Sequence, residues 1–164
     1  MASTGRERVR FVDLTALSDP ELLPSTVAQA LGVPVSGQDP MASLTAYLAP
    51  TRMLMVLDGC ECVVEAAAVL AERLLIAAPG LLLLATSREP LRIRGEWVVR
   101  LAPLELPDTP AAVDLAAVHH YSALALFMER SAAAGGPPIE QDDLPALVQL
   151  CRKLDGNPLA LEIA

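Results

Sequence analysis

The fold is decided by the stretch Met53-Leu54-Met55-Val56-Leu57-Asp58 and by a second stretch of the same kind, Leu81-Leu82-Leu83-Leu84-Ala85-Thr86-Ser87-Arg88. Each is a short apolar run that leads into polar residues, a pattern typical of a strand buried on both faces of a parallel sheet. The carboxyl ends of parallel strands lie at one edge of the sheet, where open α/β folds bind ligands. We therefore expect Asp58 and Arg88 to lie side by side at that edge.

Working outward, strand and helix patterns alternate through the first two thirds of the 164-residue chain, and only helix patterns follow. Strands are expected at 9–14, 53–58, 81–87 and 96–101, and helices at 20–31, 41–48, 65–77, 112–134, 142–154 and 159–164. Strands that alternate with helices indicate a parallel sheet with helical crossovers. The sequence therefore predicts an α/β core over 1–110 and the start of a small helical part over 111–164.

Composition narrows the class of protein. Hydrophobic residues make up 53% and charged residues 20%, so the chain should fold. The net charge of −8 argues against direct nucleic-acid binding by this segment. The N-terminus has no apolar core of a signal peptide, and no apolar stretch approaches the roughly 20 residues that span a bilayer. We expect a cytoplasmic protein without a membrane segment.

The cysteines and histidines do not follow a metal-site pattern. Cys60 and Cys62 lack a second ligand pair at zinc spacing, Cys151 is remote, and His119 and His120 are adjacent at an expected helix start. Buried free thiols are the better interpretation.

Two acidic residues could serve phosphate chemistry at the end of the strand 53–58. An acid at the end of a buried strand can hold Mg²⁺ beside a triphosphate, and Asp58 has that position. A second acid a few residues on, Glu61, could orient or deprotonate an attacking water. The alternative is that Asp58 only begins a turn, as aspartate often does after a strand.

The next strand ends in Thr86, Ser87 and Arg88, two hydroxyls and a guanidinium that could contact a γ-phosphate. The alternative is a surface arginine that pairs with Glu89.

Together these stretches resemble a known family. Residues 53–62 (MLMVLDGCEC) resemble the Walker B stretch of the STAND class of signalling ATPases, the NB-ARC-like domains of bacterial LuxR- and AfsR-type transcriptional regulators. Residues 79–96 (PGLLLLATSREPLRIRGE) look like the sensor strand of that family, and residues 151–164 (CRKLDGNPLALEIA) resemble its GLPLA motif. Residues 9–31 fit the strand and helix that follow the P-loop helix.

The resemblance implies a three-layer αβα P-loop NTPase core and a role for each matching residue. Asp58 would be the Mg²⁺ ligand, Arg88, next to Thr86 and Ser87, the γ-phosphate sensor, and Glu61 a candidate catalytic base. Pro158 would pack near the adenine, with Gly156 permitting the turn. Leu159 and Leu161 are expected in the core.

The sequence departs from the family pattern at several points. Gly59 stands where an acid or amide is usual, Cys62 where histidine is common, and Asn157 where leucine is usual. The family's first strand, Walker A loop and first helix have no counterpart, and Lys153 is the only lysine. Because that loop supplies most of the phosphate contacts, we do not expect tight ATP binding by this chain.

The predicted function is therefore part of an ATP/ADP-binding switch domain in a larger regulator, with Mg²⁺ and nucleotide bound in the full-length context. Whether the chain is an enzyme stays open. The alternative is a non-catalytic protein-interaction module derived from that family. It would bind the remaining domains, another protein or a second copy through the sheet edge beside 81–84, which lacks its neighbouring strand. No hydrolase elbow or dinucleotide glycine fingerprint is present.

Overall fold

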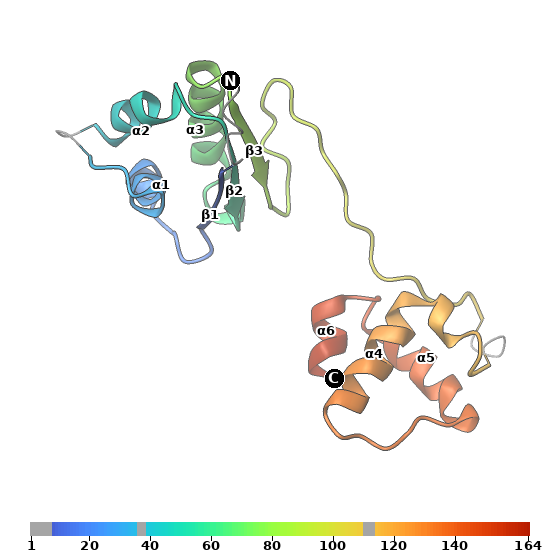
Figure 1. Ribbon diagram of the computed structural model, residues 1–164. Helices are drawn as coiled ribbons and strands as arrows, with labels where there is room; N and C mark the ends of the chain where they lie inside the picture. Colours follow the sequence, from blue (N-terminus) through green and yellow to red (C-terminus); the bar gives the residue numbers. More distant parts are fainter. Residues whose placement is uncertain (1–7, 36–38, 110–113) are drawn as a thin grey trace, which may run out of the picture. The chain divides into compact units, whose positions relative to one another are not determined.

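The computed structural model describes residues 8–35, 39–109 and 114–164 (Figure 1). Contacts divide the chain into two compact units, Met1–Val98 and Val99–Ala164, and each is treated by itself. The first unit is α/β, and the second contains only helices within its described residues.

The first unit is built on a three-stranded parallel sheet, which confirms the predicted α/β class. Its strands are β1 (Arg8–Asp13), β2 (Met53–Asp58) and β3 (Leu81–Ala85), in the order β1-β2-β3. Arg8 lies opposite Met53, and Met53 lies opposite Leu81. The three carboxyl ends therefore meet at one edge of the sheet.

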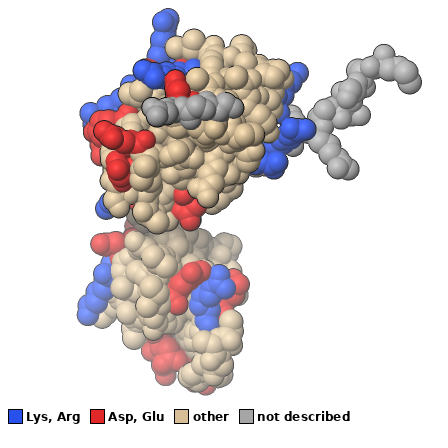
Figure 2. Space-filling view, turned by 90° about the vertical axis from the view of Figure 1, so that its left-hand side faces the viewer, with Lys and Arg blue, Asp and Glu red and all other residues tan. Residues whose placement is uncertain are grey.

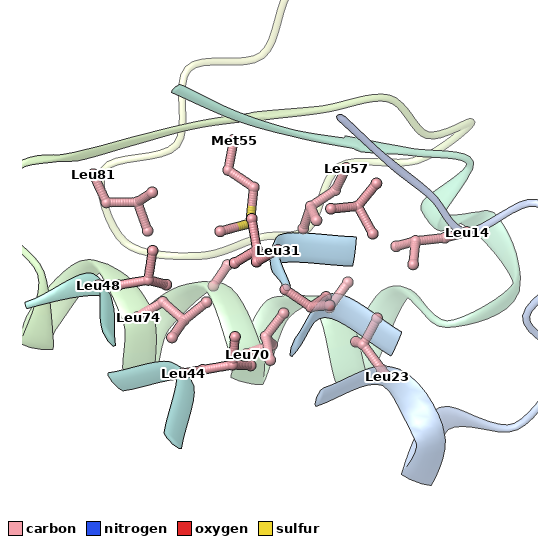
Figure 3. Packing of buried hydrophobic residues seen from close by; sticks show 14 of the residues in the cluster. Leu14, Leu23, Leu31, Leu44, Leu48, Met55, Leu57, Leu70, Leu74 and Leu81 are labelled. Carbon is pink, nitrogen blue, oxygen red and sulfur yellow. The ribbon is translucent and has the colours of Figure 1, made fainter. Parts of the chain in front are cut away.

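Three helices pack on one face of this sheet, α1 (Leu23–Leu31), α2 (Pro40–Leu48) and α3 (Val64–Ala77). Short 3-10 turns precede α1 and α3, at Pro20–Leu22 and Cys60–Cys62. Figure 3 shows leucines and Met55 filling the space between strands and helices. The burial of these aliphatic side chains stabilises the first unit by roughly 25 cal/mol per Å² of apolar surface removed from water.

The other face of the sheet is exposed, so the expectation of strands buried on both faces is wrong for the described residues. Burial alternates along β2, and on β3 Leu82 and Leu84 are 69% and 53% exposed. Val9 and Phe11 of β1 are exposed on the same face. Within the described ranges no helix covers this face, as in an αβα core that lacks one layer.

The segment after β3 differs from the prediction, because 96–101 forms no strand. The loop before it is held in the first unit. Leu91 is buried in the core, and the Glu96 carboxylate accepts the backbone N–H groups of Leu91 (2.9 Å) and Arg92 (2.7 Å). The aromatic and β-branched residues that follow favour a strand only where a neighbouring strand pairs with them.

The second unit packs three helices, α4 (Ser122–Ala133), α5 (Leu144–Lys153) and α6 (Pro158–Ile163), with 3-10 turns at Val118–His120 and Gln141–Asp143. Of the helix predicted over 112–134, the described residues form an α-helix only from Ser122 to Ala133, and residues 110–113 lie outside the described residues. The hydrophobic core of the second unit consists of Val118, Ala123, Leu124, Leu144, Leu147, Val148, Cys151 and Leu161.

The segment 99–109, which the sequence groups with the first part, contacts the second unit instead. The Leu104 N–H donates to the Gly156 carbonyl (2.9 Å), and the Glu105 N–H donates to the Ser122 hydroxyl (2.8 Å).

Two burial expectations are corrected. Leu161 lies in the core as expected, but Leu159 is exposed on α6. Cys60 and Cys151 are buried free thiols, whereas Cys62 is exposed. Among the helices described, none is long and apolar enough to cross a membrane.

Candidate functional site

The carboxyl edge of the sheet brings Asp58 and Thr86 into direct contact. Asp58 is the last residue of β2 and Thr86 follows the last residue of β3. The Thr86 hydroxyl donates to Asp58 Oδ1 (2.6 Å) and accepts the Gly59 N–H (3.0 Å). The Thr86 carbonyl accepts the Cys60 N–H (3.0 Å). One threonine thus joins the acid, the turn that follows it and the neighbouring strand.

This arrangement leaves one side of the Asp58 carboxylate available. The residue is half-buried, and only Oδ1 has a hydrogen-bond partner among the residues that the structure describes. Mg²⁺ takes oxygen ligands and is usually held by one or two carboxylates while it keeps several waters. A carboxylate oriented through one oxygen, with the other open at a sheet edge, fits that requirement.

Glu61 lies in the turn directly after Asp58, and both acids act on Cys60 between them. Burial raises the pKa of the Cys60 thiol to about 11, and the negative charges of Glu61 and Asp58 add to that rise. A thiol with this pKa is neutral at pH 7, so Cys60 is unsuited to nucleophilic or metal-ligand roles.

Ser87 and Arg88 have different surroundings. The Ser87 hydroxyl accepts the Glu89 N–H (3.3 Å) and so helps to form the turn. Arg88 is exposed, and Glu89 pairs with Arg92 (3.8 Å) instead of Arg88. Within the described part of the chain the Arg88 guanidinium has no ion-pair partner, so the alternative of an Arg88–Glu89 pair is wrong.

The backbone conformation and the packing at position 59 explain why a glycine follows Asp58. Gly59 has a φ of +78°, and a Cβ at this position would lie 2.6 Å from Thr15 Cγ2 and 3.2 Å from Thr15 Cα. The loop after β1 therefore leaves no room for the acid or amide that the family pattern has here.

The strand before that loop ends in a carboxylate that sequence reasoning missed. Asp13 ends β1 and is the register partner of Asp58. Its Oδ1 accepts the Thr15 hydroxyl (2.6 Å) and the Thr15 N–H (2.9 Å), and these bonds lower the pKa of Asp13. The sequence feature that could have identified Asp13 as a candidate site residue is its position at the end of the strand predicted over 9–14.

Gly156 and Pro158 lie in the second unit, whereas Asp58 and Arg88 lie in the first. Gly156 has a φ of +62°, and a Cβ there would lie 2.5 Å from the Leu104 carbonyl oxygen. Pro158 opens α6, and Asn157 caps that helix by accepting the N–H groups of Leu159 (3.0 Å) and Ala160 (3.3 Å). These residues have clear local roles, and their contact with adenine stays a prediction.

Three further features bear on the kinds of ligand that the chain could bind. In the part of the chain that the structure describes, no group of three His, Cys, Asp or Glu side chains could hold a metal ion by itself. Figure 2 shows basic and acidic side chains in small separate groups among uncharged residues. An apolar groove of 360 Å³ lies among the starts of α1, α2 and α3, and its lining includes neither Asp58 nor Thr86.

The chain is similar to segments of longer mycobacterial proteins. It is 38% identical over 165 residues to "Putative HTH-type transcriptional regulator Rv0890c" of Mycobacterium tuberculosis, across 99% of this chain and 17% of that protein. A Mycobacterium bovis protein of the same kind, Mb0914c, matches equally. An uncharacterized M. tuberculosis protein, Rv0894, is 32% identical over 154 residues, 36% of its length. No family model and no solved structure matches.

Proposed function

We propose that the first unit is the Mg²⁺- and phosphate-sensing part of an ATP/ADP-responsive switch domain of the STAND type, within a transcriptional regulator. The observation that carries this proposal is the Thr86 bridge. It holds the Asp58 carboxylate at the carboxyl edge of the sheet. Arg88 lies two residues beyond Thr86 and has no ion-pair partner among the described residues.

The roles follow from the chemistry of these groups. Bound Mg²⁺ would neutralise phosphate charge. Asp58 would face the ion through Oδ2, because Thr86 occupies Oδ1. The Arg88 guanidinium would make charge-assisted bonds to phosphate oxygens. Glu61, one turn away, is the candidate for orienting a water.

The same bridge offers a switching route. Loss of a terminal phosphate would release Arg88, which follows Thr86 and Ser87 in the turn after β3, and Thr86 couples the end of β3 to Asp58 and Gly59. A two-state shift of this loop would then report nucleotide state to attached domains.

The regulator context rests on the relatives. Proteins named as HTH-type transcriptional regulators contain a segment similar to 99% of this chain, which spans 17% of their length. The net charge of −8 argues against direct nucleic-acid binding by this segment, so any contact of such a regulator with DNA would belong to the remainder of the protein.

A titration of the purified chain with a fluorescent ATP analogue, with and without Mg²⁺, tests the proposal. Because the sequence has no glycine-rich loop ending in lysine, we expect weak binding, at high micromolar to millimolar nucleotide. Asp58→Ala should abolish the Mg²⁺-dependent part, and Arg88→Ala should weaken binding with or without the ion.

Thr86 provides a matched pair of variants. Thr86→Ser keeps the hydroxyl bonded to Asp58 and should retain Mg²⁺ dependence, whereas Thr86→Val should lose it. The absence of any binding at millimolar nucleotide, with circular dichroism unchanged, would contradict nucleotide sensing by this chain.

That result would favour the second candidate, a non-catalytic interaction module. The specific observation for it is the exposed apolar face formed by Val9, Phe11, Leu82 and Leu84. Faces of this kind are commonly sites of protein association.

A further inference from the structure

Arg88 lies on a short loop, residues 87–90, that is attached to the first unit at both of its ends. Before the loop, the Thr86 hydroxyl is bonded to the Asp58 carboxylate (2.6 Å). After the loop, Leu91 is only 7% exposed and belongs to the hydrophobic core. The place of the Arg88 side chain at the edge of the sheet therefore depends on how firmly these two ends are held.

The Glu96 side chain holds the second end. Its Oε1 accepts the Leu91 N–H (2.9 Å) and its Oε2 accepts the Arg92 N–H (2.7 Å), so both carboxylate oxygens bind backbone. The Glu96 N–H donates in turn to the Ile93 carbonyl (3.2 Å), which closes the turn between them. Hydrogen bonds to a charged group are stronger than those between neutral groups. One side chain thus binds two consecutive backbone N–H groups directly after the loop.

The backbone that Glu96 binds has an uncommon conformation. Arg92 has a φ of +60°, a left-handed conformation that costs energy for a residue other than glycine. The ion pair of Arg92 with Glu89 (3.8 Å) is exposed and contributes little to holding it. The two bonds that the Glu96 carboxylate accepts are therefore the interaction that keeps this turn in place.

We infer that Glu96 is a positioning residue for the phosphate sensor, which sets the place of the Arg88 guanidinium through the backbone of Leu91 and Arg92. This inference rests on the function proposed above for Arg88. A guanidinium binds phosphate oxygens best when its planar donors are held in a fixed orientation. Loss of the Glu96 bonds would free the loop at one end and leave the Thr86 bridge intact at the other.

Glu96→Gln tests the effect on the loop, because it removes the negative charge and one acceptor oxygen with little change of size. In the nucleotide-free chain, the NMR order parameter of the Arg88 amide should fall from about 0.85 to below about 0.6. Hydrogen exchange of the Leu91 and Arg92 amides should become about tenfold faster or more. The Gly59 amide, which donates to the other anchor, should keep its exchange rate. Circular dichroism should stay unchanged, because residue 96 lies outside the helices and strands.

The titration with a fluorescent ATP analogue tests the effect on the sensor. Glu96→Gln should weaken binding about threefold to tenfold. The factor by which Mg²⁺ strengthens binding should not change, since Asp58 keeps its bond to Thr86. In an Arg88→Ala background, Glu96→Gln should weaken binding no further, because it acts through Arg88. The direction of the change is informative, since the loss of a negative charge would by itself favour an anionic ligand.

Glu89→Gln is the matched control, because it removes the same charge beside Arg88 and leaves the bonds to the Leu91 and Arg92 N–H groups intact. It should keep the Arg88 order parameter and bind nucleotide at least as well as the parent chain.

Two results would overturn the inference while leaving the proposed function in place. They are an unchanged order parameter of Arg88 in Glu96→Gln, and a weakening by Glu96→Gln that is equally large with and without Arg88. A parent chain that binds no nucleotide at millimolar concentration would contradict the proposed function. The sensor role of Glu96 would then fall with it, even where the order parameters change as expected.

Discussion

The Cys60 side chain is buried beneath the turn that carries Asp58 and Glu61, and this gives the first unit its own pH dependence. The folded state raises the pKa of this thiol to about 11, above the usual value of 9.0, so folding favours the neutral form. The stabilisation from Cys60 is therefore complete below pH 9 and is lost as the pH rises towards 11.

We expect the free energy of unfolding to fall between pH 9 and 11 by up to about 1.4 kcal/mol per pH unit from this residue. The measurement is urea unfolding across this range in a Cys151→Ala background, because Cys151 has a similarly raised pKa. Cys60→Ala should flatten the slope and Cys62→Ala should not. An unchanged slope in Cys60→Ala would contradict the assignment.

The position of Asp58 at the end of β2 followed from the sequence, because an apolar run that ends in aspartate marks the end of a strand. Its bond to Thr86 could not be predicted in the same way. That bond depends on the register of two strands that are separated by α3 along the chain. From the sequence alone, the Thr86 hydroxyl could equally bind a phosphate. Leu159 shows the same limit, since a family motif does not reveal which of its leucines is exposed.

At the scale of elements, α6 depends on its first residues. Asn157 accepts two backbone N–H groups of the first turn, and Pro158 begins the helix. The departure from the family's leucine at this position therefore supplies a side-chain cap that leucine lacks.

Asn157→Ala should destabilise the second unit by about 1 kcal/mol, because it removes this cap. Asn157→Asp should stay near the parent value, since aspartate accepts the same bonds. Denaturant unfolding followed by helical circular dichroism is the measurement. Equal midpoints for the alanine variant and the parent would show that the cap contributes nothing.

The elements that the sequence predicted best are those with both a clear pattern and a clear stop. Residues 53–58 and 81–85 form strands, and the helix between them ends before Pro79-Gly80, as expected. The segment 96–101 has comparable strand preference but no neighbour among the described residues, and β-structure requires one. The alternating burial of β2 likewise depends on which layers are present, which a uniformly apolar run does not encode.

At the scale of the whole molecule, the chain should separate into two parts under limited proteolysis. Arg100 is exposed and lies in the unpaired segment between the two cores, whereas Arg92 and Arg94 follow the buried Leu91. In dilute solution trypsin should first produce fragments 1–100 and 101–164, identified by mass spectrometry. Arg100→Gln should slow this first cleavage. A first cut within 53–85 would contradict the division.

The two-part organisation followed from the change of pattern along the sequence, from alternating strands and helices to helices alone. The position of the change could not be predicted to the residue. Leu104 and Glu105 look like a continuation of the preceding loop, and only their hydrogen bonds to Gly156 and Ser122 attach them to the second unit.

The register of the sheet sets an order for folding. Met53 pairs with Leu81 across one short turn and α3, whereas Arg8 pairs with Met53 across α1, α2 and their loops. The shorter loop loses less entropy when it closes, so β2, α3 and β3 should assemble first and β1 should join afterwards. Conservative truncations such as Leu74→Ala would then slow refolding, while Val12→Ala would mainly speed unfolding in stopped-flow measurements.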